Sequence, residues 1–101
     1  MERVLSNNKV PIRLTEERWI HIVENHDDLA GHYDDFLDTV ENPDMIVQGF
    51  GEALMAIKEM ERNSFLAVVY KETTHEDGFI ITSYFTSKIT RRSILWRKTK
   101  E

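Results

Sequence analysis

The strand that decides the fold is expected at Gly78-Phe79-Ile80-Ile81-Thr82-Ser83-Tyr84-Phe85-Thr86, in the last third of the chain. Successive side chains of a strand point to opposite faces, so Thr82, Tyr84 and Thr86 should share one face. Hydroxyl groups stand there at positions that apolar side chains would fill in an ordinary buried strand. The following segment, residues 87–100, is basic. Hydroxyl groups beside cations suit a phosphate or sugar ligand.

Two amphipathic helices are expected before this strand. Trp19, Ile22, Val23 and His26 follow the i, i+3, i+4, i+7 spacing of one helix face, and Thr15 is a suitable N-cap. The same spacing recurs in a second segment, at Tyr33, Phe36, Leu37 and Val40. The sequence 42–44, Asn-Pro-Asp, ends that second helix.

Beyond residue 44 the apolar residues alternate, which predicts strands at 45–50, 52–60, 65–71 and 78–86 and a short edge strand at 93–97. A short edge strand is also expected before the helices, at 10–14. Segment 52–60 also allows a helix, because Ala, Leu, Met, Glu and Lys are strong helix formers. Its position between two turns favours the strand. The expected fold class is α+β, with two N-terminal helices packed on one face of an antiparallel meander sheet of about four strands.

The length of 101 residues fits a single domain, in which residues 1–9 and 97–101 are expected to be a flexible leader and a flexible tail. No apolar run approaches the roughly 20 residues that a membrane span needs. The first residues lack a signal-peptide pattern, and the chain has no cysteine. These features predict a cytoplasmic protein without membrane contact, and they leave the oligomeric state open.

The charge is unevenly distributed along the chain. The net charge is −5, which argues against general nucleic-acid binding. Residues 1–79 hold 7 Lys/Arg and 17 Asp/Glu, a net of −10, whereas residues 80–101 hold 6 and 1, a net of +5. The C-terminal cations either form a local basic patch or pair with the acidic helices.

One family resemblance covers about residues 12–96. A helix ending in Glu24-Asn25-His26, a second helix closed by Glu41-Asn42-Pro43-Asp44, a meander and the strand Ile81-Thr82-Ser83-Tyr84-Phe85-Thr86-Ser87-Lys88-Ile89 occur in this order. Together they resemble the phage-associated nuclease-like domains of the barnase-EndoU-colicin-RelE fold.

The resemblance implies a metal-independent ribonuclease of toxin or mobile-element type, in which the 2′-hydroxyl of RNA attacks the adjacent phosphorus. It implies a catalytic group made of four residues, His26, Thr82, Tyr84 and Lys88. Substrate binding falls to Thr86 and to the basic residues Arg91 and Arg92. No cofactor and no metal are expected, although a metal site built from His26, Asp27 and His32 is a minor alternative. RNA and a protein such as an antitoxin are the implied partners.

The surroundings of His26 depart from the family pattern and support an alternative. Family members often have a basic residue before this histidine and Pro-Glu after it, whereas here the order is Asn25-His26-Asp27-Asp28. The alternative is a non-catalytic interaction module that retains the nuclease fold. Its acidic helical face would meet a basic protein partner through Asp27, Asp28, Asp34, Asp35 and Asp38. His26 would then only end its helix.

Overall fold

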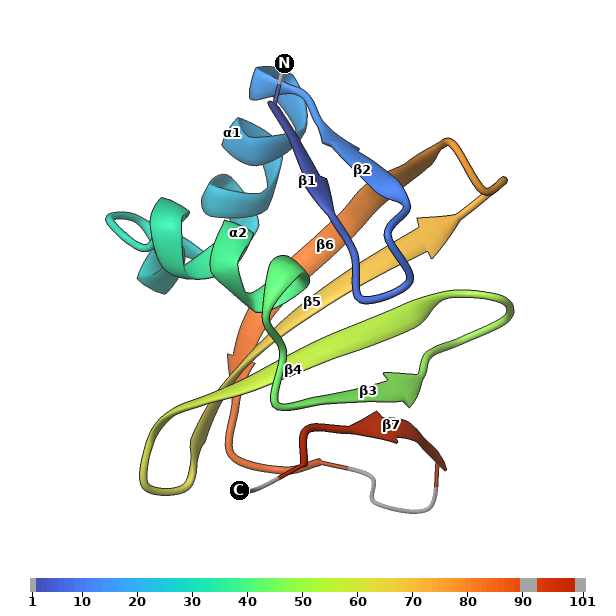
Figure 1. Cartoon of the computed structure of the whole chain (residues 1–101). Helices are drawn as coiled ribbons and strands as arrows, with labels where there is room; N and C mark the ends of the chain where they lie inside the picture. The colour runs from blue at the N-terminus through green and yellow to red at the C-terminus, as the bar shows by residue number, and fades with distance from the viewer. Residues whose placement is uncertain (1, 90–92, 100–101) are drawn as a thin grey trace.

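The computed structural model describes residues 2–89 and 93–99 (Figure 1). Its elements are, in chain order, β1 (Glu2–Leu5), β2 (Pro11–Leu14), α1 (Glu16–Asn25), the short 3-10 helix η1 (Asp27–Leu29), α2 (Tyr33–Glu41), β3 (Met45–Gln48), β4 (Leu54–Glu61), β5 (Ser64–Glu72), β6 (Gly78–Thr86) and β7 (Ile94–Arg97).

The strands form one seven-stranded mixed sheet in the order β1-β2-β6-β5-β4-β3-β7. The expected meander is present as β3-β4-β5-β6, with every pair antiparallel. The expectation of a sheet of about four antiparallel strands is nevertheless wrong. The β1–β2 hairpin adds two strands at one edge, where β2 runs parallel to β6, and β7 adds one at the other edge, beside β3.

The β1–β2 hairpin replaces the flexible leader that the sequence led us to expect. Its two strands have four residues each and are joined by a turn in which the Ser6 N–H donates to the Val10 carbonyl at 2.9 Å. Lys9 takes a left-handed conformation in that turn, with φ of 66°. The predicted edge strand at 10–14 is confirmed as β2. The strand β1 is too short to show an alternating pattern, and the pairing of β2 with β6 is set by contacts far along the chain.

Segment 52–60 forms a strand, as we preferred, and β4 covers most of it. This strand lies between β3 and β5, and it buries Ala56 and Ile57 on opposite faces of the sheet. Helix propensity amounts to only tenths of a kcal/mol per residue, so pairing on both sides outweighs it.

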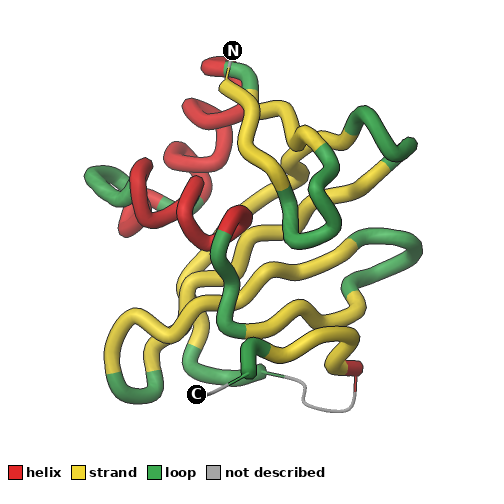
Figure 2. Tube along the Cα trace, viewed as in Figure 1, coloured by secondary structure: helices red, strands yellow, loops and turns green. Residues whose placement is uncertain are grey.

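The helices α1 and α2 lie together on one side of the sheet (Figures 1 and 2). The predicted apolar stripes face the sheet, and Ile22, Phe36 and Val40 are fully or almost fully buried. Thr15 is the N-cap of α1, as predicted, because its hydroxyl accepts a hydrogen bond from the Arg18 N–H at 3.1 Å. The main hydrophobic core therefore lies between the helices and the middle of the sheet.

A smaller core lies on the opposite face of the sheet. Met45, Val47, Ile57 and Ala67 form its buried centre. Partly buried side chains pack around this centre, among them Tyr84 of β6 and Ile89 of the segment after β6. Tyr84 is therefore half enclosed by apolar groups.

Tyr70 is fully buried in the main core, and its hydroxyl has no hydrogen-bond partner in the described structure. A buried unsatisfied polar group costs about 1–3 kcal/mol. Tyr70→Phe should therefore leave the free energy of unfolding unchanged or raise it by about 1 kcal/mol. Chemical denaturation of Tyr70→Phe and of a control variant, Tyr33→Phe, checks this expectation. The control removes a hydroxyl outside the buried core. A clear loss of stability in Tyr70→Phe would mean that the hydroxyl has a partner.

Candidate functional site

His26 ends α1 and begins the segment that leads to α2. Its backbone N–H donates to the Ile22 carbonyl at 2.8 Å, and its φ of −138° lies outside the helical region. From there η1 passes against β6. His26 is thus the helix-ending residue that we considered, and its ring is also placed beside β6.

The His26 ring lies beside the Tyr84 ring, with centroids 6.0 Å apart and planes inclined by 39°. The two residues are far apart in sequence, and contact between α1, η1 and β6 brings them together. A histidine and a tyrosine at this separation can bind one small group between or beside them. This pair is the centre of the candidate site.

Thr82, Tyr84 and Thr86 share one face of β6, as the alternation predicted. They lie opposite Val69, Ala67 and Phe65 of β5, on the face of the sheet that carries the smaller core. The remaining hydroxyl of this strand, that of Ser83, is buried on the other face and donates to the Ala67 carbonyl at 2.8 Å. Ser83 therefore stabilises the sheet, and Thr82 and Tyr84 are left facing outward from the main core.

Tyr84 is suited to donate a hydrogen bond. Burial raises the pKa of the Tyr84 phenol above its usual value, so the hydroxyl keeps its proton at neutral pH. Within the described residues, no hydrogen bond engages this hydroxyl. A phosphate oxygen placed there would meet a neutral donor.

Thr86 holds the turn that presents Lys88. Its hydroxyl accepts from the Lys88 N–H and donates to the Lys88 carbonyl, both at 3.1 Å. A threonine hydroxyl has one proton, so Thr86 cannot also donate to a substrate without opening this turn. The substrate contact that the resemblance implied for Thr86 would therefore require this turn to open.

Lys88 is exposed. No carboxylate lies within ion-pair distance of it among residues 2–89 and 93–99. Its charge is thus available to an anion near the end of β6. Arg91 and Arg92, the other expected substrate-binding residues, lie outside the described residues.

A second contact made by a histidine, the pair of His32 with Asp35, was not predicted from the sequence. His32 precedes α2, and its Nδ1 lies 3.0 Å from Oδ2 of Asp35. Its ring meets the Phe85 ring edge-on, with centroids 5.2 Å apart. The i, i+3 spacing across a helix start was the available signal, because a polar residue there faces the residue before the helix. Both histidines of this connection therefore contact neighbouring residues of β6.

The minor metal alternative receives no support from the described part of the chain. No group of three or more His, Asp or Glu side chains there is arranged to hold a metal ion. His32 instead pairs with Asp35, and His26 lies beside an aromatic ring.

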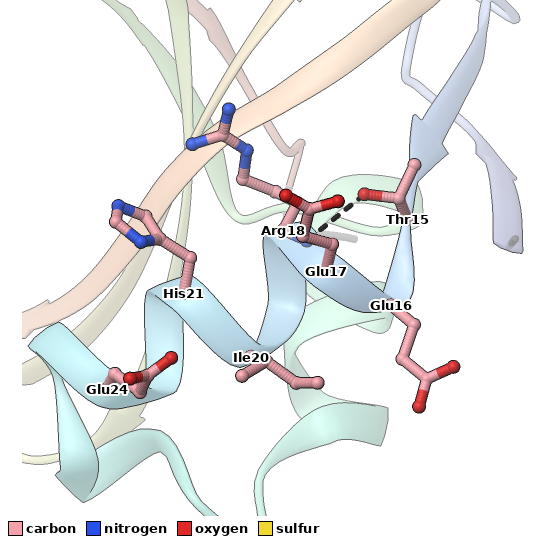
Figure 3. Close-up of a pocket in the computed structure, with 7 residues that line it drawn as sticks. All are labelled: Thr15, Glu16, Glu17, Arg18, Ile20, His21 and Glu24. Atoms are coloured by element: carbon pink, nitrogen blue, oxygen red, sulfur yellow. Dashed lines mark hydrogen bonds between the residues drawn. The ribbon is translucent and has the colours of Figure 1, made fainter.

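The exposed side of α1 carries a wide, open hollow of about 850 Å³ (Figure 3). Its lining side chains point in different directions: Arg18 and His21 lie on one side of the helix, and Glu16 on the other. They do not converge on a point where a substrate atom would bind. Ile20 is 49% exposed within this acidic surface.

The acidic helical face is only partly free. Lys58 hydrogen-bonds to Asp38, and this contact, with a smaller one from Asn42, lowers the pKa of the Asp38 carboxyl. Asp35 is engaged by His32. The remaining members, Asp27, Asp28 and Asp34, are exposed.

The chain matches no protein-family model, and comparisons with curated proteins and with solved structures give no significant match. Family membership therefore gives no support to any of the proposed site residues, and the function has to be argued from the geometry. None of the described helices has the length and apolar character needed to cross a membrane.

Proposed function

We propose that the protein is a metal-independent RNA endonuclease whose centre is the His26–Tyr84 pair. One observation carries the proposal: the His26 imidazole lies beside the protonated Tyr84 phenol, with ring centroids 6.0 Å apart. Imidazole changes its protonation near neutral pH, which suits a general base. Lys88 lies four residues beyond the phenol along the chain, and no carboxylate of the described residues pairs with it.

Each group has a role in attack by the 2′-hydroxyl on phosphorus. His26 accepts the proton of the 2′-hydroxyl, and the resulting oxygen bonds to phosphorus while the bond to the 5′ oxygen breaks. Tyr84 and Thr82 donate hydrogen bonds to the phosphoryl oxygens, and Lys88 offsets their charge. Water protonates the departing 5′ oxygen, and the hydroxide left behind takes the proton from His26. The product carries a 2′,3′-cyclic phosphate.

The charge distribution limits the affinity for RNA in this proposal. Asp27 and Asp28 follow His26 directly and are exposed. Carboxylates near the phosphate repel RNA, and added salt weakens contacts between exposed charges further. We therefore expect cleavage to be strongest at low ionic strength.

Tyr84→Phe tests the role of the phenol, because it keeps the ring against His26 and removes only the donor. Loss of one donor to a charge that develops in the transition state costs about 100-fold in rate. Cleavage of a mixed-sequence RNA by Tyr84→Phe should fall by about this factor, and Tyr33→Phe should cleave at the wild-type rate. Equal rates in the two variants would exclude the Tyr84 hydroxyl from the mechanism.

A second function, a non-catalytic interaction module, is favoured by the exposed helical surface. Asp27 and Asp28 are exposed on η1 and Asp34 on α2, and Ile20 is an exposed apolar side chain among the glutamates of α1. Such a surface suits a basic protein partner. This function predicts a complex whose affinity falls with salt and with replacement of these aspartates by asparagine, while RNA stays intact. Binding that ignores both changes would exclude it.

A further inference from the structure

A second and smaller hollow, of about 390 Å³, lies at the opposite end of α1 from His26. It forms where the starts of β1, α1 and α2 meet the end of β2. Figure 1 shows the starts of β1 and α1 close together, near the N-terminus. Its lining residues are Glu2, Leu14, Thr15, Glu16, Trp19 and Tyr33.

Two aromatic rings form the wall of this hollow. The rings of Trp19 and Tyr33 meet edge to face, with centroids 5.0 Å apart and planes at 72°. Trp19 also packs on Phe36, a fully buried residue of the main core, at 4.9 Å. The core therefore holds the rings in place before any ligand arrives, which reduces the entropy lost on binding.

Negative charge surrounds these rings. Glu2 and Glu16 line the hollow from β1 and from the first turn of α1. Burial raises the pKa of the Tyr33 phenol, and the negative charges of Glu2 and Asp34 raise it further. The start of α1 contributes partial positive charge, which Glu16 and Glu17 offset.

We infer that this hollow binds an organic cation of the alkylammonium class, held against the faces of Trp19 and Tyr33 with Glu2 and Glu16 as counter-charges. Aromatic faces attract cations, and ammonium groups that carry methyl groups are the ones that aromatic cages recognise. An anion would be repelled by the carboxylates. A neutral apolar ligand would leave two carboxylates beside it without a partner. The inference is independent of the proposed ribonuclease.

Two sources can supply this headgroup: a small quaternary ammonium compound, or a methylated lysine on a polypeptide. Choline represents the first, and a short peptide with trimethyllysine represents the second. Titration of the whole protein with each, followed by NMR chemical shifts of the Trp19 indole, should give saturable binding. Similar affinities would indicate that the headgroup alone is recognised, and tighter peptide binding would point to a polypeptide ligand. Absence of saturation with both probes overturns the inference.

The neutral analogue 3,3-dimethylbutan-1-ol separates charge recognition from apolar filling, because it has the shape of choline without the charge. Its affinity should be lower than that of choline by about two- to fivefold, which is the usual effect of a cation–π contact at an exposed site. Equal binding of choline and the neutral analogue would show that the hollow recognises apolar shape and would overturn the inference.

Two charge-neutralising variants locate the site. Glu16→Gln should weaken choline binding about two- to fivefold, whereas Glu24→Gln, which makes the same change on the same helix outside this hollow, should not. Trp19→Leu should abolish binding, and Tyr33→Leu checks the other ring if the first variant melts early. Equal effects of Glu16→Gln and Glu24→Gln would place the cation elsewhere.

Discussion

His26→Ala is expected to reduce cleavage of RNA by about two to four orders of magnitude, which is the usual contribution of a positioned general base. The alanine removes the imidazole that would take the proton of the 2′-hydroxyl. The helix end itself should persist, because the bond from the residue 26 N–H to the Ile22 carbonyl belongs to the backbone. Initial rates on a mixed-sequence RNA at low salt measure the effect.

His75→Ala is the matched control for this experiment. His75 is an exposed histidine in the loop between β5 and β6, and this variant should cleave at the wild-type rate. Thermal melts of both variants show whether the fold survives. A His26→Ala protein that is folded and fully active would remove His26 from the mechanism.

Gly78→Ala should destabilise the protein strongly, by about 3 kcal/mol, at the upper end of the usual cost of overpacking. A Cβ at this position would lie 2.5 Å from the Lys71 carbonyl oxygen and 2.6 Å from Cδ1 of Ile12. Gly78 stands where β6 pairs with β2 on one side and with β5 on the other. The carbonyl cannot retreat unless β5 and β6 separate.

Ile12→Val in the Gly78→Ala background tests this geometry, because valine lacks the Cδ1 atom. The double variant should regain part of the lost free energy of unfolding, although Ile12→Val alone costs about 1 kcal/mol. Chemical denaturation of the four proteins measures the coupling. An unchanged stability of Gly78→Ala would contradict the close approach of β2, β5 and β6.

The sequence predicted the helices and the meander because each has a local repeat. The i, i+3, i+4 spacing of α1 and α2 and the alternation in β4, β5 and β6 depend on neighbouring residues alone. The strand β1 has no such repeat and was expected to be part of a flexible leader, and the parallel pairing of β2 with β6 joins residues 12 and 78. Pairing over that distance is decided by packing, so the number and direction of the strands could not be inferred.

In the candidate site, too, local sequence patterns predicted some features, and others depend on contacts between distant parts of the chain. Alternation along β6 sufficed to place Thr82, Tyr84 and Thr86 on one face. It could not show that the Thr86 hydroxyl hydrogen-bonds to the backbone of Lys88, or that the rings of His26 and Tyr84 lie side by side. These contacts depend on how η1 packs against β6, which no local pattern describes.

The most direct test of the central claim is to incubate a mixed-sequence RNA with the wild-type protein at low salt and with a chelator, and to identify the ends of the products. The His26–Tyr84 mechanism predicts chelator-resistant cleavage that leaves 2′,3′-cyclic phosphate and 5′-hydroxyl ends. A substrate with a 2′-deoxy residue at the cut position should then remain whole. Intact RNA, cleavage that the chelator stops, or products with 3′-hydroxyl ends would contradict the account.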